Sequence, residues 1–223
     1  MFKLFNRKSQ PKIFCISFQR TGTTSVGQFF REHGYRVAGY EKERSLRWAA
    51  LRLVGNYEAI FNSKEFIEYQ VFEDNPWWEG DFYKVLYHRF PDAKFILFTR
   101  DADKWFDSMV SHSNGKTLGN TFRHSKNYHR EEEFYAKFPD LDYYKTLREI
   151  DNLMFIEEKH RAHYKAIYNL RNREVLEFFK AFSPDSLFIG ELEEEQKWVK
   201  LGAFFGIEVS EVYNVHANKT LIK

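Results

Sequence analysis

Short apolar runs alternate with amphipathic segments along the first half of the chain. Four such runs predict strands, at residues 12–17, 35–38, 69–73 and 94–99. The first and last are nearly continuous in apolar residues, which is typical of strands that are buried on both faces. Apolar residues spaced three and four apart predict helices at residues 25–33 and about 81–90. Strands that alternate with helices indicate βαβ units and therefore a parallel sheet.

The second half of the chain has a mostly helical pattern. Apolar side chains recur at helical spacing at Leu147, Ile150, Leu153, Met154, Tyr164, Ile167 and Tyr168. Pro184 ends this stretch, and a strand at 187–189 and a helix at 193–205 follow. We therefore expect a three-layer α/β domain with a central, mostly parallel sheet of about five strands and a helical insertion in the second half. Because no linker is evident, residues 1–223 should form a single domain, with residues 1–11 flexible.

Composition narrows the class of protein. The 223 residues are 43% hydrophobic and 30% charged, which suits a folded core. A net charge of +2 argues against bulk electrostatic binding to nucleic acid. A single cysteine, Cys15, rules out an internal disulfide framework, and no apolar run approaches the ~20 residues of a membrane-spanning helix. We expect a cytoplasmic protein with no integral membrane segment.

The turn after the first predicted strand has the composition of an anion site. Residues 17–25 combine a glycine, several hydroxyl side chains and Arg20 at the start of a helix. Helix N-termini present backbone N–H groups and the positive end of the dipole, which favours phosphate or sulfate. In the phosphate-binding pattern GxxxxGK[ST], Gly22 matches the second glycine but Thr23 replaces the lysine that reaches the phosphates of ATP. The alternative is an ordinary helix start capped by Ser or Thr.

A second phosphate signal follows the strand at 94–99. Arg100 leaves the end of this strand, and Ser108 comes eight residues later, in the first turns of the next predicted helix. Ligands in open parallel sheets bind beyond the carboxyl ends of the strands, so the two side chains could share one anion. The alternative is an arginine paired with Asp101 or Asp103 and a serine on a solvated helix face.

Together the two segments resemble the sulfotransferases that use 3′-phosphoadenosine-5′-phosphosulfate (PAPS). Residues 17–25 resemble their 5′-phosphosulfate loop, and residues 94–108, with Trp105, resemble their 3′-phosphate motif, in a form close to that of bacterial members. Residues 190–206 resemble the family's C-terminal strand and helix. The resemblance implies a P-loop-like fold, no metal, and in-line transfer of a sulfuryl group to a hydroxyl or amine. The acceptor would be a carbohydrate, a lipid or a small molecule.

The resemblance also assigns roles to residues. Arg20 would contact the bridging oxygen and stabilise the charge of the departing product, 3′-phosphoadenosine-5′-phosphate (PAP). Arg100 and Ser108 would hold the 3′-phosphate, which distinguishes PAPS from ATP. The residues that would cradle the 5′-phosphate are Thr21, Gly22, Thr23, Thr24 and Ser25.

The general base is the least determined part of the site. In the family it is a His, Glu or Asp near the end of the second or third strand, where this chain offers Glu41, Glu43, Glu73 and Asp74. We favour Asp74, and then Glu41. A turn before Pro76 explains Asp74 equally well, and the run from Glu41 to Arg44 is typical of a solvated helix start. Trp77 and Trp78 could form an acceptor platform.

Other hypotheses stay open on the sequence alone. An ATP-dependent kinase on the same fold and a catalytically silent PAP-binding module are the two alternatives to a sulfotransferase. The basic segment 111–130 could be a lid, and residues 216–219 could close over the cofactor. Glu157, His160 and His163 share a helical spacing, which we interpret as a solvated face and not as a metal site. The acceptor and the oligomeric state are not encoded in any pattern that we identify.

Overall fold

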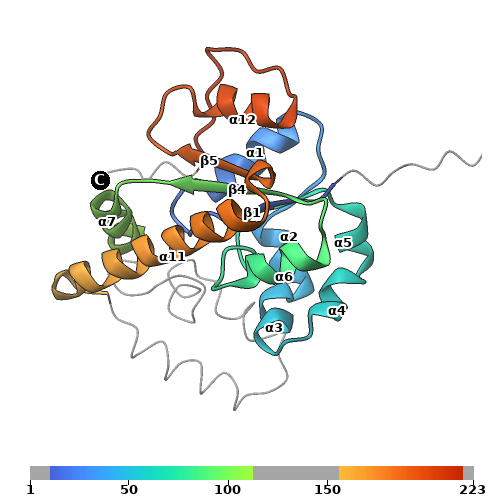
Figure 1. Cartoon of the computed structure of the whole chain (residues 1–223), viewed down its shortest axis with the longest axis horizontal. Helices are drawn as coiled ribbons and strands as arrows, with labels where there is room; N and C mark the ends of the chain where they lie inside the picture. Colours follow the sequence, from blue (N-terminus) through green and yellow to red (C-terminus); the bar gives the residue numbers. More distant parts are fainter. Residues whose placement is uncertain (1–10, 113–155, 218–223) are drawn as a thin grey trace, which may run out of the picture. The chain divides into compact units, whose positions relative to one another are not determined.

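The structure is a computed structural model that describes residues 11–112 and 156–217 (Figure 1). Contacts between Cα atoms divide these residues into two compact units. The first unit contains the described residues up to Thr99 and those from Leu176 onward, and the second runs from Arg100 to Val175. Most of the basic segment 111–130, and the apolar residues between Leu147 and Met154, lie outside the described residues.

The first unit is built on a parallel sheet of five strands. Their order across the sheet is β2-β3-β1-β4-β5, and every neighbouring pair is parallel. Ile13 in the central strand lies beside Val71 on one side and Lys94 on the other. The predicted parallel sheet of about five strands is therefore confirmed. The strands are β1 (Ile13–Cys15), β2 (Val37–Ala38), β3 (Val71–Phe72), β4 (Lys94–Thr99) and β5 (Leu187–Glu191).

Helices cover both faces of this sheet. The helices of the first unit are α1 (Thr23–Glu32), α2 (Tyr40–Leu46), α3 (Trp48–Leu53), α4 (Tyr57–Phe61), α5 (Lys64–Glu68), α6 (Phe82–Arg89), the end of α11 (Arg161–Phe182) and α12 (Lys197–Phe205). In Figure 1, α1 and α12 lie on one side of the sheet, and α2 to α6 lie on the other. This arrangement confirms the expected three-layer α/β class.

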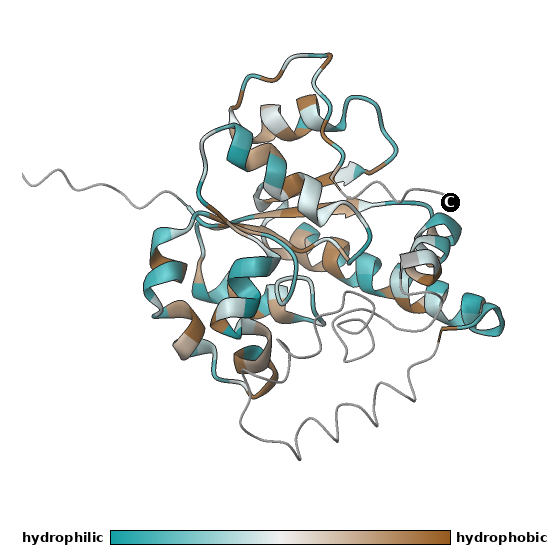
Figure 2. Ribbon diagram, turned by 180° about the vertical axis from the view of Figure 1, so that it is seen from behind, coloured by the Kyte–Doolittle hydropathy of each residue, from teal (hydrophilic) through white to brown (hydrophobic). Residues whose placement is uncertain are grey.

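Aromatic side chains fill the layer on each face. On the α1 side, Phe29 stacks on Trp198 with ring centroids 5.5 Å apart. On the opposite side, Phe14 packs between Phe72 at 5.2 Å and Trp77 at 5.4 Å. The strands between these layers are hydrophobic over most of their length (Figure 2), as expected for a sheet that is buried on both faces.

The described part of the second unit is a helix pair with a short 3₁₀ turn. It contains α7 (Ala102–His112), a 3₁₀ turn at Glu158–His160 and the first part of α11. Trp105 of α7 stacks on Tyr168 of α11, with ring centroids 4.5 Å apart and an interplanar angle of 18°. Both rings are buried, so this aromatic pair joins the two helices.

Several predicted boundaries were wrong. Strands β1, β2 and β3 are shorter than the predicted 12–17, 35–38 and 69–73, and α1 begins at Thr23 and not at residue 25. The last helix begins at Lys197 and not at residue 193, because residues 192–196 form turns in which Glu194 pairs with Lys200. The final strand extends to Glu191 and not to residue 189, because its whole length pairs with β4, as far as Thr99. Of helices α2 to α5, the sequence indicated only the start of α2, at the run from Glu41 to Arg44, and the other three were not predicted.

Candidate functional site

Two hydroxyl groups hold the loop between β1 and α1 in its conformation. The buried Ser17 hydroxyl accepts a hydrogen bond from the N–H of Phe98 at 2.8 Å and donates one to the C=O of Ile96 at 3.2 Å. The buried Thr21 hydroxyl donates to the C=O of Phe18 within the loop. Ser17 thus attaches the end of β1 to the neighbouring strand β4, and Thr21 closes the turn that contains Arg20.

The backbone of this loop is in a conformation that favours glycine. Gly22 has a φ of 85°, and Arg20, which has a side chain, has a φ of 65°. A positive φ costs a non-glycine residue about 1 kcal/mol, and such strain is found most often at functional sites. A Cβ atom on Gly22 would lie 2.6 Å from Cδ1 of Leu192, so a larger residue would have to displace that side chain as well as adopt the positive φ.

The first turn of α1 suits an external anion. It contains no acidic residue, whereas the first turns of α2, α4 and α5 each contain glutamate. The residue at its N-cap is Gly22, which has no side chain to cap the helix. Thr23 and Thr24 follow and add hydroxyl groups to the positive end of the helix dipole. The features that predicted an anion site from the sequence are therefore present together at this turn.

The C-terminal segment reaches the same turn. The N–H of Ala217 donates a hydrogen bond to the Ser25 hydroxyl at 3.1 Å. Further back, the Tyr213 hydroxyl bonds to Glu32 at the other end of α1, and Val215 is buried in the core between them. The described part of this segment therefore runs along α1 as far as its first turn, and the last residues of the predicted closing segment, from 218, lie outside the described residues.

Asp74 lies in the turn after β3 and, like Arg20 in the loop after β1, has a strained backbone conformation. Its φ is 76°, and its Oδ1 accepts the N–H of Asn75 at 2.9 Å. Burial raises the pKa of Asp74, and hydrogen bonds from Asn75 and the Trp78 indole, together with the charge of Arg20, oppose that rise in part. Because β1 and β3 are parallel neighbours, the two strained residues lie beyond the carboxyl ends of adjacent strands, at the same end of the sheet. Asp74 also starts a turn, since its C=O accepts the N–H of Trp77 at 3.2 Å.

Glu73 occupies a slot formed by two glycines. A Cβ atom on Gly27 of α1 would lie 2.7 Å from Cγ of Glu73, and one on Gly39 would overlap Oε1. That oxygen lies 3.4 Å from Nη2 of Arg31, while Oε2 has no hydrogen-bond partner among the described residues. Burial, and then the charge of Asp74, raise the pKa of Glu73 well above its usual range. Glu73 is therefore an interior carboxyl group, which the sequence alone did not indicate.

The two glutamates of α2 have different environments. Glu41 is exposed and pairs with Arg44 at 3.1 Å, as expected for a solvated helix start. Glu43 is only 5% exposed, and its Oε1 accepts the N–H of Ala49 at 2.8 Å. Burial raises the pKa of Glu43 to about 8. The expectation of a solvated helix start is wrong for Glu43, because its carboxyl group is turned inward to the start of α3.

Trp77 and Trp78 do not form a joint platform. Trp77 is completely buried and packs against Trp48 at 5.5 Å and Phe72 at 5.0 Å, so it belongs to the core. Trp78 stacks on Phe18 of the loop, with ring centroids 5.5 Å apart. Of the two, Trp78 therefore lies at the loop between β1 and α1.

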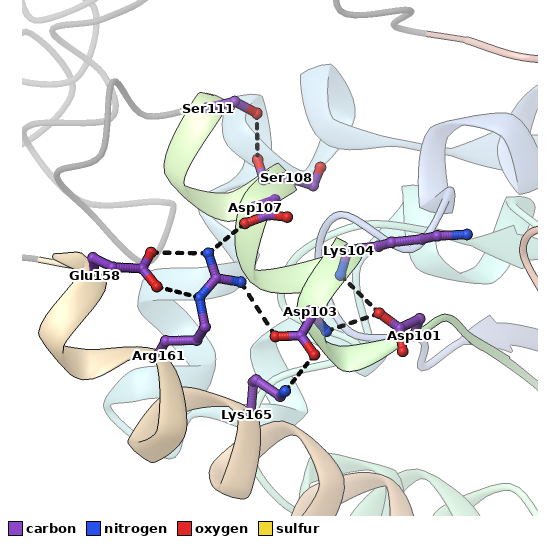
Figure 3. Close-up of polar contacts among 9 residues, drawn as sticks. All are labelled: Asp101, Asp103, Lys104, Asp107, Ser108, Ser111, Glu158, Arg161 and Lys165. Carbon is purple, nitrogen blue, oxygen red and sulfur yellow. Dashed lines mark hydrogen bonds and ion pairs between the residues drawn. The ribbon is translucent and has the colours of Figure 1, made fainter.

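Arg100 and Ser108 lie in the second unit. Arg100 directly follows β4, and its N–H donates a hydrogen bond to the Tyr168 hydroxyl at 3.0 Å. Ser108 is half-buried on α7, and its side chain points away from Arg161 (Figure 3). The acidic residues that were alternative partners for Arg100 have other partners. Asp101 accepts the N–H groups of Asp103 and Lys104, each at 3.0 Å, and Asp103 pairs with Arg161 and Lys165.

The described residues offer no metal site and no membrane span. No group of three or more His, Cys, Asp or Glu side chains is arranged to hold a metal within residues 11–112 and 156–217. Of the predicted helical trio, Glu157 and His160 form a cap in which the N–H of Glu157 donates to Nδ1 of His160 at 3.2 Å. In the same part of the chain, every helix is too short or too polar to cross a bilayer.

Comparison with known proteins gives the family. This chain is similar to a crystal structure of a sulfotransferase from Alicyclobacillus acidocaldarius, with 14% sequence identity and a TM-score of 0.47. The alignment covers 93% of this chain and 87% of the other. Among curated proteins, none matches the sequence. The family model of the sulfotransferase domain matches residues 12–220, which cover both units and nearly the whole chain. The chain therefore belongs to the sulfotransferase domain family.

Proposed function

We propose that the chain transfers a sulfuryl group from PAPS to a hydroxyl or amine of a carbohydrate, lipid or small-molecule acceptor. The observation that supports this most directly is the strained Arg20, which precedes an α1 N-terminus without acidic residues and acts electrostatically on Asp74. A cation, a helix N-terminus and a carboxyl group at one sheet edge are the groups that sulfuryl transfer requires.

On the donor side, the loop would bind the 5′-phosphosulfate. The backbone and hydroxyl groups of Thr23 and Thr24 would contact the phosphate, with Arg20 at the bridging oxygen. Thr21 would act through the backbone, because its hydroxyl group is bonded to Phe18, and Ser25 would link the site to Ala217. As the bond between sulfur and the bridging oxygen breaks, the negative charge that develops on PAP would be stabilised by Arg20 and by the helix dipole.

On the acceptor side, we propose Asp74 as the general base. The acceptor oxygen or nitrogen forms a bond to sulfur and loses a proton, which the Asp74 carboxylate would take. A carboxyl group whose pKa is raised by burial is a better proton acceptor than an exposed one, and Asp74 has this property. Glu41 is the second candidate, although it is exposed and engaged with Arg44. Trp78, beside Phe18, would contact the acceptor.

We assign the 3′-phosphate to Arg100 and Ser108. This assignment separates the proposal from an ATP-dependent kinase, which would need a lysine at the position of Thr23 and a bound magnesium ion. That the two units form a single domain, and that the protein is cytoplasmic, remain predictions.

Calorimetric titration with PAP, 5′-AMP and Mg-ATP tests the proposed donor. We expect PAP to bind without metal and more tightly than 5′-AMP, because only PAP carries the 3′-phosphate. Preference for Mg-ATP would instead support the kinase. Tight PAP binding without transfer to any acceptor would support the silent module.

A further inference from the structure

Tyr168 makes two hydrogen bonds to the backbone of Arg100. Its hydroxyl group accepts the N–H of Arg100 at 3.0 Å and donates to the C=O of the same residue at 3.3 Å. A phenol hydroxyl can do both at once, since it is one donor and one acceptor. The Tyr168 ring is 1% exposed and stacks on Trp105, which is also 1% exposed. The hydroxyl group is thus held at a fixed place against Arg100.

The position of Arg100 in the chain explains why it needs this support. The register of the sheet ends one residue earlier, where Thr99 pairs with Glu191. The first backbone bond at the start of α7 joins the N–H of Trp105 to the C=O of Asp101 at 2.8 Å, one residue later. Arg100 therefore lies between a strand and a helix, and the Tyr168 hydroxyl satisfies backbone groups that belong to neither.

Ion pairs keep α11, which carries Tyr168, in place along α7. Arg161 contacts Asp103 at 3.3 Å and Asp107 at 2.6 Å, and Lys165 pairs with Asp103 (Figure 3). These charges lie on the α7 face that is turned to α11, away from the Ser108 side chain. The stacked rings and the ion pairs together oppose sliding of one helix along the other.

We propose that Tyr168 is a positioning residue for recognition of the 3′-phosphate. Its hydroxyl group fixes the backbone of Arg100, and thereby the point from which the guanidinium group reaches the phosphate. The inference rests on the proposed function, because it requires Arg100 to be a ligand of the 3′-phosphate. Tyr168 itself contacts no substrate in this account.

The test compares PAP with 5′-AMP in Tyr168→Phe, which removes the hydroxyl group and keeps the ring stacked on Trp105. We expect the PAP dissociation constant to rise about five- to tenfold, and that of 5′-AMP to change less than about twofold. Tyr164→Phe is the matched control, because Tyr164 lies one turn earlier on α11 and packs on Phe106. It should leave both dissociation constants unchanged. Trp105→Phe, which loosens the stack while the hydroxyl group remains, should give a smaller loss of PAP affinity in the same direction.

A double-mutant cycle separates positioning from general destabilisation. In an Arg100→Ala background, Tyr168→Phe should have no further effect on PAP binding, because the side chain that it positions is absent. Equal weakening of PAP and 5′-AMP, or the full effect of Tyr168→Phe in that background, would overturn the inference. So would a normal PAP preference in Tyr168→Phe, which would leave the proposed function intact. A wild-type protein that binds PAP no better than 5′-AMP would overturn both.

Discussion

At the scale of single residues, two members of the proposed site have strained backbone conformations. Arg20 and Asp74 both have a positive φ. Arg20 lies in the loop after β1, and Asp74 lies in the turn after the neighbouring strand β3. Such conformations persist where the surrounding structure holds them, and here the charge of Arg20 acts on the carboxyl group of Asp74. Arg47, between α2 and α3, has a similar φ of 58° but is exposed, so it provides an internal control.

Glycine at position 20 should relieve the backbone strain at this residue and lower the rate of sulfuryl transfer. We expect Arg20→Gly to raise the free energy of unfolding by about 0.5–1 kcal/mol and to lower turnover of PAPS by at least about tenfold. Arg47→Gly should stabilise the protein similarly without loss of turnover. Urea unfolding and PAP release from PAPS measure the two effects. Loss of turnover in both variants would show that strain relief itself is harmful, and would contradict the role of Arg20.

Asp74→Asn tests the general base with little change in shape. Asparagine tolerates a positive φ, so the protein should fold, while transfer should fall by about 10²-fold or more and PAP affinity should change less than about twofold. In the wild type, transfer should fall as pH decreases through the raised pKa of Asp74, because the protonated carboxyl group cannot accept a proton. Asp81→Asn, at an exposed helix start, is the control. Full transfer activity in Asp74→Asn would show that another residue is the general base, and Glu41 would be the next candidate.

At the scale of elements, α2 and α3 are joined through a buried carboxyl group. Glu43 of α2 accepts the N–H of Ala49 in the first turn of α3, and burial raises its pKa to about 8. In the unfolded chain this carboxyl group should have a pKa near its ordinary value of 4.5. The folded state therefore binds the proton more tightly, so that the contribution of Glu43 to stability is complete below about pH 4.5 and is lost as pH rises to about 8.

The Glu43→Gln variant should lose this pH dependence. We expect its free energy of unfolding at pH 9 to exceed that of the wild type by roughly 2–4 kcal/mol, and the difference to shrink at pH 5, where both side chains are neutral. Denaturant unfolding at the two pH values measures this, with the exposed Glu41→Gln as control. An equal difference at both pH values would show that Glu43 does not titrate between them.

At the scale of the whole molecule, the features that could be predicted from the sequence are those that depend on the local pattern of residues. The parallel sheet followed from apolar runs, and the loop from a glycine and hydroxyl groups at a helix start. The burial of Glu43 and Glu73 was not predictable, because it depends on tertiary contacts with Ala49 in one case and with Gly27 and Gly39 in the other. Likewise α2 to α5 have only five to seven residues each, too few for a clear helical period.

The strain at Arg20 and Asp74 was equally hidden, because arginine rarely adopts a positive φ and aspartate does so only in a minority of positions. The sequence did place both at strand ends, and the order β2-β3-β1-β4-β5 makes those ends neighbours. Candidate residues were therefore predictable from position, and their electrostatics were not.

The most direct measurement of the central claim is PAP affinity in Arg100→Ala beside the wild type. We expect the loss of one charged hydrogen-bond partner to weaken PAP binding by roughly 1.5–3 kcal/mol, and to leave PAP no better bound than 5′-AMP. Lys104→Ala, which removes an exposed cation from the same helix, should leave PAP binding unchanged. Unaltered PAP affinity in a folded Arg100→Ala protein would contradict recognition of the 3′-phosphate by Arg100, and with it the assignment of PAPS as the donor.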